Sequence, residues 1–237
     1  MNTPPALVVA LDFPEENQAL NLARKLRGVV PWVKVGLELY LASGRQFVQH
    51  LKKMGFSVFL DLKFMDIPNT VQAATAQVTA MGVDMLTIHA LGGRAMCEAA
   101  LTGRAQAHEA GTTPPLILGV TLLTSLGPAD LAWQPRGTAE SLHKLTLDLA
   151  ASAQKWKLDG VVCSGREVCD IRNTCGASFQ LLTPGIRLPD AACGDQARVC
   201  TPAQAARDGS NFLVVGRPIT RAENPVQAAE EYLRDMA

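Results

Sequence analysis

The residues of this chain best suited to chemistry are two lysines and two aspartates that lie at the ends of apolar segments. Asp61 and Lys63 are two positions apart, and Asp66 follows closely. Lys34 stands near the end of an earlier apolar segment. Because buried charges are costly unless they are paired, an alternating Lys–Asp–Lys–Asp array is one that could persist in a protein interior. Such an array could hold and transfer charge in a reaction, or it could be an ion-pair network that only closes one end of the fold.

A framework must bring these charges together, and the chain offers short apolar segments that alternate with helix-like ones along its whole length. The apolar segments are rich in Val, Ile and Leu, as expected for strands of a parallel sheet that is covered on both faces. The predicted strands are Ala6–Leu11, Trp32–Val35, Ser57–Leu60, Met85–His89, Leu116–Thr121, Gly160–Cys163, Gln180–Thr183 and Phe212–Val215.

Between these strands, apolar residues recur with the spacing of amphipathic helices, and we expect each apolar stripe to face the core. One helix should start near Glu15, and another should follow the helix-start signal Pro68–Asn69. The predicted stripes are Ala19, Leu22, Ala23 and Leu26; Val71, Ala74, Val78 and Met81; and Leu142, Leu145 and Leu149.

Eight strands that alternate with helices, with no change in composition and no low-complexity linker, predict a (β/α)8 TIM barrel forming a single domain over residues 1–237. The 237 residues divide into eight units of about 30, roughly the length of one strand, one helix and their connections. The alternative, an open doubly wound sheet, would need a Gly-x-Gly-x-x-Gly turn after the first strand. Here that strand is followed by Asp12-Phe13-Pro14, so the barrel is favoured.

Composition excludes several classes of protein. Apolar residues make up 48% of the chain and charged residues 19%, which argues against general disorder. The 22 Lys and Arg balance the 22 Asp and Glu, so no overall positive charge attracts nucleic acid or an anionic membrane. We see no apolar stretch of the roughly 20 residues that cross a bilayer, and no secretory signal in residues 1–5. The 6 cysteines show no C-x-x-C pair or zinc-spaced histidine, so we expect free thiols in a soluble cytoplasmic protein.

The barrel prediction indicates where the charged residues should meet. Active sites of such barrels lie at the C-terminal ends of the strands, where this chain carries Asp12, Lys34, Asp61 and Lys63. Because side chains two apart on a strand point to the same face, Asp61 and Lys63 should both face the interior. Lys34, on the neighbouring strand, can reach the same place, and Asp66 follows in the next loop.

The run from Asp61 to Thr70, DLKFMDIPNT, closely resembles the signature of the orotidine 5′-phosphate decarboxylase family. Further segments resemble family segments in the same order, from about residue 6 to residue 233: Leu11-Asp12, Val33–Gly36, Leu123–Ser125, Val161–Ser164, Thr183–Arg187, Gly194–Gln196 and Val214–Thr220. The signature is highly specific, whereas Gly-Arg-Pro-Ile alone would only suggest a barrel that binds phosphate.

The resemblance implies the decarboxylation of orotidine 5′-monophosphate to uridine 5′-monophosphate and CO2, the last step of UMP biosynthesis. The family uses no cofactor as an electron sink and the sequence shows no metal motif, so neither a cofactor nor a metal is expected. The protein must then stabilise a carbanion at carbon 6 by preorganised charge and supply a proton. By resemblance, Lys63 is the proton donor and Asp61 lies beside the departing carboxylate. Lys34 would anchor Asp61, and Asp66 would complete the array.

The resemblance also implies contacts with the rest of the substrate, beyond those of Lys34 and Asp61. Asp12 matches a residue that hydrogen-bonds the ribose, and Thr124 matches one that contacts the pyrimidine. The residues that match phosphate binders are Arg187, Gln196, Gly216 and Arg217. Their types suit the task, because glycine lets backbone N–H groups approach an anion and arginine offers a charge-assisted fork.

A homodimer is implied as well, because the family residues that match Asp66 and Thr70 reach into the active site of a second subunit. Thr70 could instead, or in addition, help to cap its own helix. His89, at the end of the fourth predicted strand, could have a supporting role in the site.

Two other functions stay open at this point. Sister sugar-phosphate decarboxylases share Asp-x-Lys-x-x-Asp on the same barrel and use Mg²⁺ to hold an enediolate, but the continuation Ile67–Thr70 favours the nucleotide enzyme. A non-catalytic sensor of phosphoribosyl ligands is the other alternative. The set of Lys34, Asp61, Lys63 and Asp66 argues against a sensor, because a protein that only binds an anionic ligand has no use for a carboxylate that faces this ligand.

Overall fold

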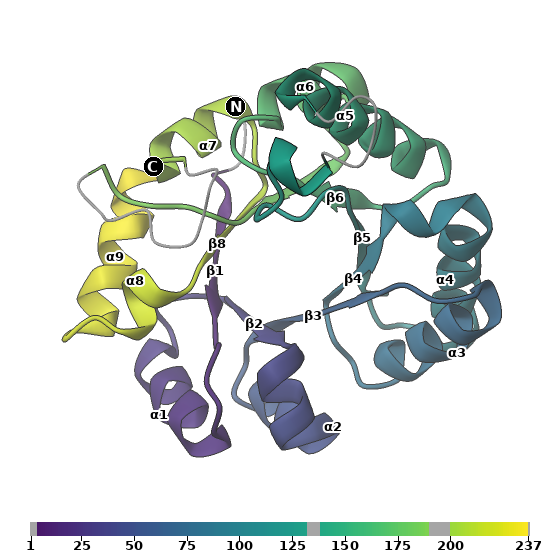
Figure 1. The fold of residues 1–237 in the computed structure, drawn as a ribbon. Helices are drawn as coiled ribbons and strands as arrows, with labels where there is room; N and C mark the ends of the chain where they lie inside the picture. Colours follow the sequence, from purple (N-terminus) through teal and green to yellow (C-terminus); the bar gives the residue numbers. More distant parts are fainter. Residues whose placement is uncertain (1–3, 132–137, 190–199, 237) are drawn as a thin grey trace.

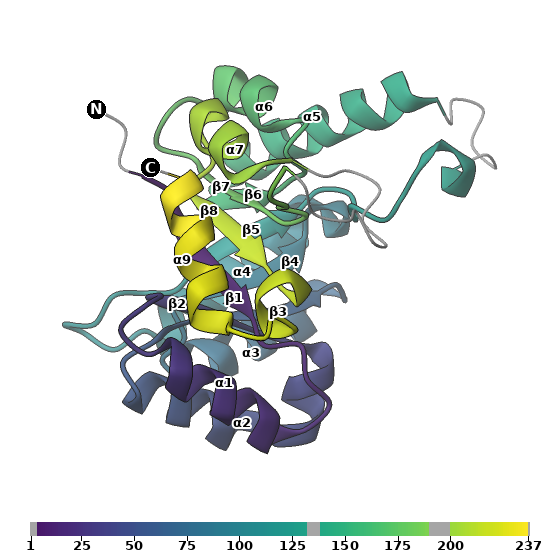
Figure 2. The same cartoon turned by 90° about the vertical axis from the view of Figure 1, so that its left-hand side faces the viewer.

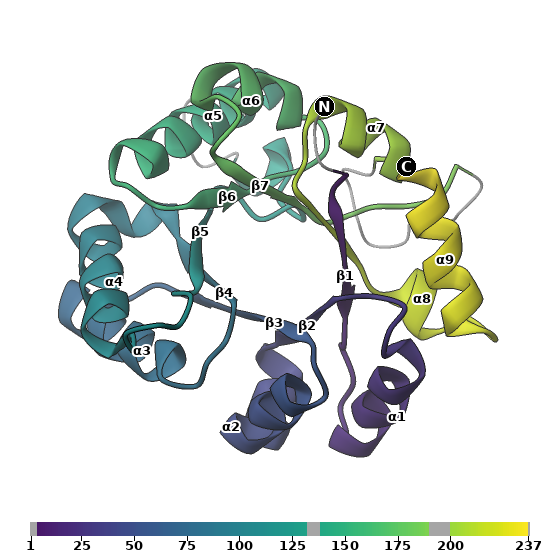
Figure 3. The same cartoon turned by 180° about the vertical axis from the view of Figure 1, so that it is seen from behind.

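The structure is a computed structural model that describes residues 4–131, 138–189 and 200–236. Eight parallel strands close into a barrel in the order β1 to β8, and β8 pairs again with β1. Figures 1 and 3 view the barrel from its two ends and show the helices as an outer ring around the strands. The closed ring confirms the (β/α)8 TIM barrel that the alternating segments predicted.

Short strands and longer helices alternate along the chain. The strands are β1 (Ala6–Ala10), β2 (Trp32–Gly36), β3 (Ser57–Phe64), β4 (Met85–His89), β5 (Leu116–Val120), β6 (Gly160–Val162), β7 (Gln180–Thr183) and β8 (Phe212–Val215). The helices are α1 (Glu16–Leu26), α2 (Leu37–Lys53), α3 (Pro68–Thr79), α4 (Gly93–Ala107), α5 (Ala139–Lys155), α6 (Val168–Cys175), α7 (Pro202–Asp208), α8 (Arg217–Thr220) and α9 (Pro225–Asp235). No helix within the described ranges is both long and apolar enough to cross a membrane.

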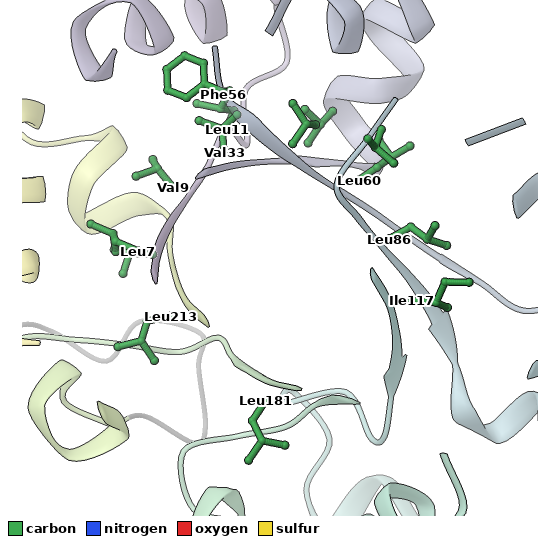
Figure 4. Packing of buried hydrophobic residues seen from close by; sticks show 14 of the residues in the cluster. Leu7, Val9, Leu11, Val33, Phe56, Leu60, Leu86, Ile117, Leu181 and Leu213 are labelled. Atoms are coloured by element: carbon green, nitrogen blue, oxygen red, sulfur yellow. The ribbon is translucent and has the colours of Figure 1, made fainter. Parts of the chain in front are cut away.

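The side chains of each strand alternate between two layers of the core, because successive residues of a strand point to opposite faces. Leu7 and Val9 of β1 belong to a large cluster of buried residues between the sheet and the helices. Figure 4 shows them pointing away from the barrel axis, as do Leu213 of the neighbouring β8 and Leu181 of β7. Val8, between them on β1, belongs to a smaller cluster inside the barrel. The inner cluster supports the floor of the site described below.

All eight predicted strands are confirmed, and only β3 differs from its predicted bounds by more than one residue. It continues past Leu60 to Phe64 across an irregularity, because Leu60 pairs with Leu86 whereas Phe64 pairs with Ile88. Three residues of β3 therefore lie opposite Thr87 alone, which makes a bulge. Simple alternation of side chains does not hold through this stretch, contrary to the prediction from a regular strand.

Two apolar residues of the predicted helical stripes lie elsewhere. Met81 follows the end of α3 at Thr79. Leu145 of α5 is 37% exposed, and the buried face of that helix runs instead through Leu142, Thr146 and Leu149. These three positions follow the spacing of four and three residues that keeps side chains on one helical face.

Polar residues join neighbouring strands at the base of the barrel, where the strands begin. A side-chain oxygen just before β4, β6 or β8 accepts a hydrogen bond from a backbone N–H of the preceding strand. The pairs are Asp84 with Val58, Asp159 with Ile117 and Asn211 with Leu181, at 2.7, 2.7 and 2.9 Å. Basic residues of α2, α4 and α6 donate to the same three side chains, namely Lys52, Arg104 and Arg172. We call these three groups the base clamps.

Candidate active site

A cavity of about 660 Å³ opens at the end of the barrel where the strands finish. Figure 2 turns the barrel onto its side, and the arrowheads of β1 and β8 point toward this end. Apolar residues from the strands, among them Phe59 and Val214, form part of the lining, and polar residues at the strand ends form the rest. The volume is typical of sites that bind small molecules.

A chain of ion pairs runs along the wall of this cavity. Lys34 Nζ lies 2.8 Å from Asp12 Oδ1 and 3.7 Å from Asp61 Oδ2. Lys63 Nζ lies 2.9 Å from Asp61 Oδ2. The structure thus brings together Asp12, Lys34, Asp61 and Lys63, which we call the charged array. Its alternating signs let each buried charge face at least one opposite charge.

The bulge in β3 brings Lys63 back to Asp61. Lys63 has a φ of 52°, in the left-handed region that residues other than glycine rarely adopt. The ammonium group nevertheless reaches the Asp61 carboxylate. The meeting of these two residues, expected from a regular strand, therefore depends on an unusual backbone conformation.

Asp66 and Thr70 are not part of the charged array within one chain. The Asp66 side chain is exposed and accepts a hydrogen bond from the Ile67 backbone N–H at 2.6 Å. Thr70 is exposed in the first turn of α3, and neither residue lines the cavity. The chain turns outward into α3 at this point, so both side chains lie on the surface of the single chain.

Asp61 is held as an anion by its neighbours. Burial is the largest single influence on the Asp61 carboxyl and by itself raises its pKa, whereas the charges of Lys34 and Lys63 lower that pKa. Hydrogen bonds from Lys63 and Thr87 act in the same direction, and the resulting pKa lies below the ordinary value of 3.8. The carboxylate is therefore ionised at neutral pH and does not serve as a proton donor.

Glycine at residue 36 leaves room for the ends of the Lys34 and Asp12 side chains. A Cβ atom on Gly36 would lie 2.9 Å from Lys34 Nζ and 3.2 Å from Asp12 Oδ1. The first of these distances is shorter than real Cβ contacts, so a side chain at residue 36 would require the end of Lys34 to shift. The segment Val33–Gly36 was singled out in the sequence, but nothing in its pattern indicated this steric role.

Two further residues reach the charged array from β4. Thr87 is fully buried, and its hydroxyl donates to Asp61 Oδ1 at 2.9 Å. His89 has a ring Nδ1 that is buried without a hydrogen-bond partner among the described residues. Burial and then the charge of Lys63 lower the pKa of His89, against the smaller opposite effect of Asp61, so its ring is neutral at pH 7. His89 was considered in the sequence, whereas Thr87 was not, because one threonine in an apolar strand is a weak signal.

A second set of polar residues in the cavity comes from the later strands. Thr124 follows β5, Arg187 follows β7, and Gly216 with Arg217 joins β8 to α8; all four line the cavity. Gln196 lies outside the described residues. Gln18, Glu38 and Arg221 also line the cavity, although the sequence patterns did not indicate them. Within the described ranges, no three His, Cys, Asp or Glu residues are grouped so as to hold a metal ion.

A cavity with charged walls at the C-terminal ends of the strands is the arrangement of a (β/α)8-barrel enzyme. The chain belongs to the orotidine 5′-phosphate decarboxylase / HUMPS family, whose model matches residues 5–232. This assignment confirms the resemblance seen in the sequence.

Curated relatives and solved structures agree with the assignment. The orotidine 5′-phosphate decarboxylase of Maridesulfovibrio salexigens is 51% identical over 230 residues, which cover 97% of this chain and 98% of the relative. That of Nitratidesulfovibrio vulgaris is 49% identical over 232 residues, covering 98% and 97%. The crystal structure of orotidine 5′-phosphate decarboxylase from Lactobacillus acidophilus matches with a TM-score of 0.86 at 36% identity, covering 99% of both chains.

Proposed function

We propose that this protein is a carboxy-lyase that converts orotidine 5′-monophosphate to uridine 5′-monophosphate and CO2, the last step of UMP synthesis. The observation that carries the proposal is the charged array on the wall of a cavity large enough for a nucleotide. Identity of about half with decarboxylases over nearly the whole chain supports the same substrate. The names of these relatives favour this reaction over that of a magnesium-dependent sugar-phosphate decarboxylase.

The reaction breaks the bond between carbon 6 and the carboxylate and leaves the electron pair on carbon 6. The Lys63 ammonium, 2.9 Å from Asp61, is suited to stabilise that charge and then to donate a proton to carbon 6. Asp61 would lie beside the departing carboxylate. Two carboxylates about 4 Å apart repel by about 4 kcal/mol at an effective dielectric constant near 20, before the lysines offset the repulsion. Lys34 would keep Asp61 charged and in place.

The remaining cavity residues are proposed to bind the rest of the nucleotide. Asp12 would accept a hydrogen bond from the ribose, and Thr124 would contact the pyrimidine. The phosphate would be bound by the residues that follow the seventh and eighth strands, a recurrent phosphate position in these barrels. They are Arg187, Gln196, Gly216 and Arg217.

The protein is further proposed to act as a homodimer in which Asp66 and Thr70 complete the partner's site. Both side chains are exposed on the single chain, and Met65 and Ile67, on either side of Asp66, are 56% and 67% exposed. Leu41, in the first turns of α2, is 81% exposed. Large exposed apolar side chains are typical of a surface that a second subunit covers.

We also propose that the protein is a single-domain enzyme of the cytoplasm. It is supported by four cysteines of the described ranges that are free thiols, namely Cys97, Cys169, Cys175 and Cys200. Free thiols are the rule in reducing compartments.

Incubation of the purified protein with orotidine 5′-monophosphate tests the proposed reaction. Absorbance of the substrate should fall while CO2 is released, and a chelator should leave the rate unchanged. Absence of turnover by a folded, dimeric sample would overturn the assignment of this reaction. Loss of turnover in the presence of chelator would instead favour the magnesium-dependent alternative.

Mixing two inactive variants tests the shared site. Lys63→Ala and Asp66→Ala chains, each inactive alone, should recover about a quarter of wild-type activity, because half of the randomly formed dimers are hybrids and each hybrid has one intact site. No recovery despite verified subunit exchange would contradict the proposal that Asp66 acts across the dimer.

A further inference from the structure

Thr87 contacts both catalytic candidates of β3, although it does not line the cavity itself. Its side chain is completely buried at the point where β4 passes the bulge. The hydroxyl lies 2.9 Å from Asp61 Oδ1 and 3.1 Å from the backbone nitrogen of Lys63. One hydroxyl group therefore links the carboxylate and the lysine of the charged array.

The direction of both hydrogen bonds follows from the chemistry of the groups. The Asp61 carboxylate can only accept, so the single hydroxyl proton of Thr87 must point toward it. The Lys63 backbone N–H can only donate, so it donates a hydrogen bond to a lone pair of the same hydroxyl oxygen. The single donor proton of the hydroxyl and one of its two lone pairs are thereby used, so no donor is left over for a ligand in the cavity.

The conformation of Lys63 explains why such a contact is needed. A lysine with a φ of 52° persists only where its surroundings hold it, because this region is unfavourable for residues with a Cβ. The bulge places three residues of β3 opposite Thr87 and interrupts the regular pairing with β4. The Thr87 hydroxyl supplies a hydrogen-bond acceptor for the Lys63 N–H at this interruption.

We propose that Thr87 is a positioning residue for the decarboxylation, holding the Lys63 backbone in its left-handed conformation and orienting the Asp61 carboxylate toward Lys63. The inference rests on the proposed function of the cavity. It concerns the chemical step more than substrate binding, because Thr87 acts through Asp61 and Lys63 and not through the nucleotide. A displacement of about 1 Å in a catalytic group can lower a rate by about 100-fold.

Three variants at this position and one control test the proposal. Thr87→Val keeps the shape of the side chain but removes the hydroxyl, whereas Thr87→Ser keeps the hydroxyl. Thr75→Val on α3 is the matched control, because Thr75 is equally buried and its hydroxyl has no hydrogen-bond partner among the described residues. Thr87→Ala is a second variant that lacks the hydroxyl. If Thr87→Val does not fold, the test compares Thr87→Ala with Thr87→Ser instead.

In steady-state kinetics with orotidine 5′-monophosphate, kcat of Thr87→Val should fall roughly 10- to 100-fold while KM changes by less than about threefold. Thr87→Ser should recover kcat to within about threefold of wild type, and Thr75→Val should match wild type. A merely structural role would lower the thermal midpoint without this split between kcat and KM. Wild-type kcat in Thr87→Val, or equal losses in the serine and valine variants, would overturn the proposal. An inactive wild-type protein would overturn the proposed function itself, and with it the role of Thr87.

Discussion

Charged residues of the same types lie at both ends of the barrel, but their surroundings differ. At the base, Asp84 and Asp159 each accept from a basic side chain of a helix and from a backbone N–H of a neighbouring strand. At the top, Asp61 lies between Lys34 and Lys63, and all three line the cavity. A carboxylate that accepts from a backbone N–H stabilises the sheet, whereas a carboxylate that lines a cavity can act on a ligand.

The exposure of the lysine does not distinguish these two kinds of ion pair. The lysine side chain is 29% exposed in the Lys52–Asp84 pair of the base and 32% exposed in the Lys63–Asp61 pair of the top. What differs is the carboxylate: Asp84 is 33% exposed and accepts from a backbone N–H, whereas Asp61 is 12% exposed and accepts from the Thr87 hydroxyl. The comparison therefore predicts that loss of a charge at the top lowers activity, and that loss of a charge in the base clamps lowers stability.

The largest effect is expected for Lys63→Met. Activity with orotidine 5′-monophosphate should fall by about 10²- to 10⁴-fold, the usual contribution of a general acid. The thermal midpoint should change much less than the activity, because Lys34 remains 3.7 Å from Asp61 Oδ2 as a partner for the buried carboxylate. Lys52→Met is the matched control, with similar exposure at the opposite end. It should keep full activity per folded molecule, and a comparable loss of activity in both variants would remove the distinction between top and base.

The next largest effect is expected for Asp159→Ala, which removes one base clamp. The backbone N–H of Ile117 would lose the carboxylate as its acceptor, and the guanidinium of Arg104 would lose the carboxylate but keep the Pro115 carbonyl oxygen. The free energy of unfolding should fall by about 1–3 kcal/mol, as measured by urea denaturation, with kcat unchanged. Asp148→Ala, which breaks only the exposed pair with Lys144, should cost less than about 0.5 kcal/mol. Equal stability of the two variants would contradict the structural role of the base clamps.

A smaller effect is expected for Gly36→Ala, which disturbs the top of the barrel without removing a charge. The new methyl group would lie 2.9 Å from Lys34 Nζ and 3.2 Å from Asp12 Oδ1, so the ends of these two side chains would have to shift. We expect kcat/KM to fall by about tenfold, equivalent to about 1.4 kcal/mol of transition-state stabilisation. Unchanged kinetics would show that the position of the Lys34 ammonium is not critical, and the charged array would then depend mainly on Lys63.

The smallest effect concerns the pH dependence of Asp61. Because its pKa is lowered in the folded protein, the unfolded chain binds the proton first as pH falls, and the contribution of Asp61 to stability is complete above the ordinary value of 3.8. The difference in unfolding free energy between wild type and Asp61→Asn should therefore stay constant from pH 7 to about pH 5. It should shrink only as pH falls below 3.8 through the folded pKa. A decline already between pH 7 and pH 5 would mean that the pKa of Asp61 is raised, not lowered.

Much of the fold could be predicted because each strand is a short apolar segment bounded by polar residues. Seven of the strands end within one residue of their predicted bounds, since burial on both faces requires continuous apolar sequence. The bulge of β3 could not be predicted, because residues 61–64 have no pattern that reveals which backbone conformation Lys63 adopts. Leu145 was misplaced for a related reason: apolar spacing indicates a face only approximately.

The chemical identity of the candidate site followed from the sequence by itself, because the signature from Asp61 to Thr70 is specific and its residue types limit the chemistry. Only the tertiary structure decided which charges meet. It placed Asp12 in the charged array, left Asp66 on the surface of the single chain, and brought Thr87 and Gly36 to the lysines. The physical reason is that hydrogen bonds and steric exclusion depend on distances of a few tenths of an ångström between separate strands. Residue types and spacing along one chain do not specify such distances.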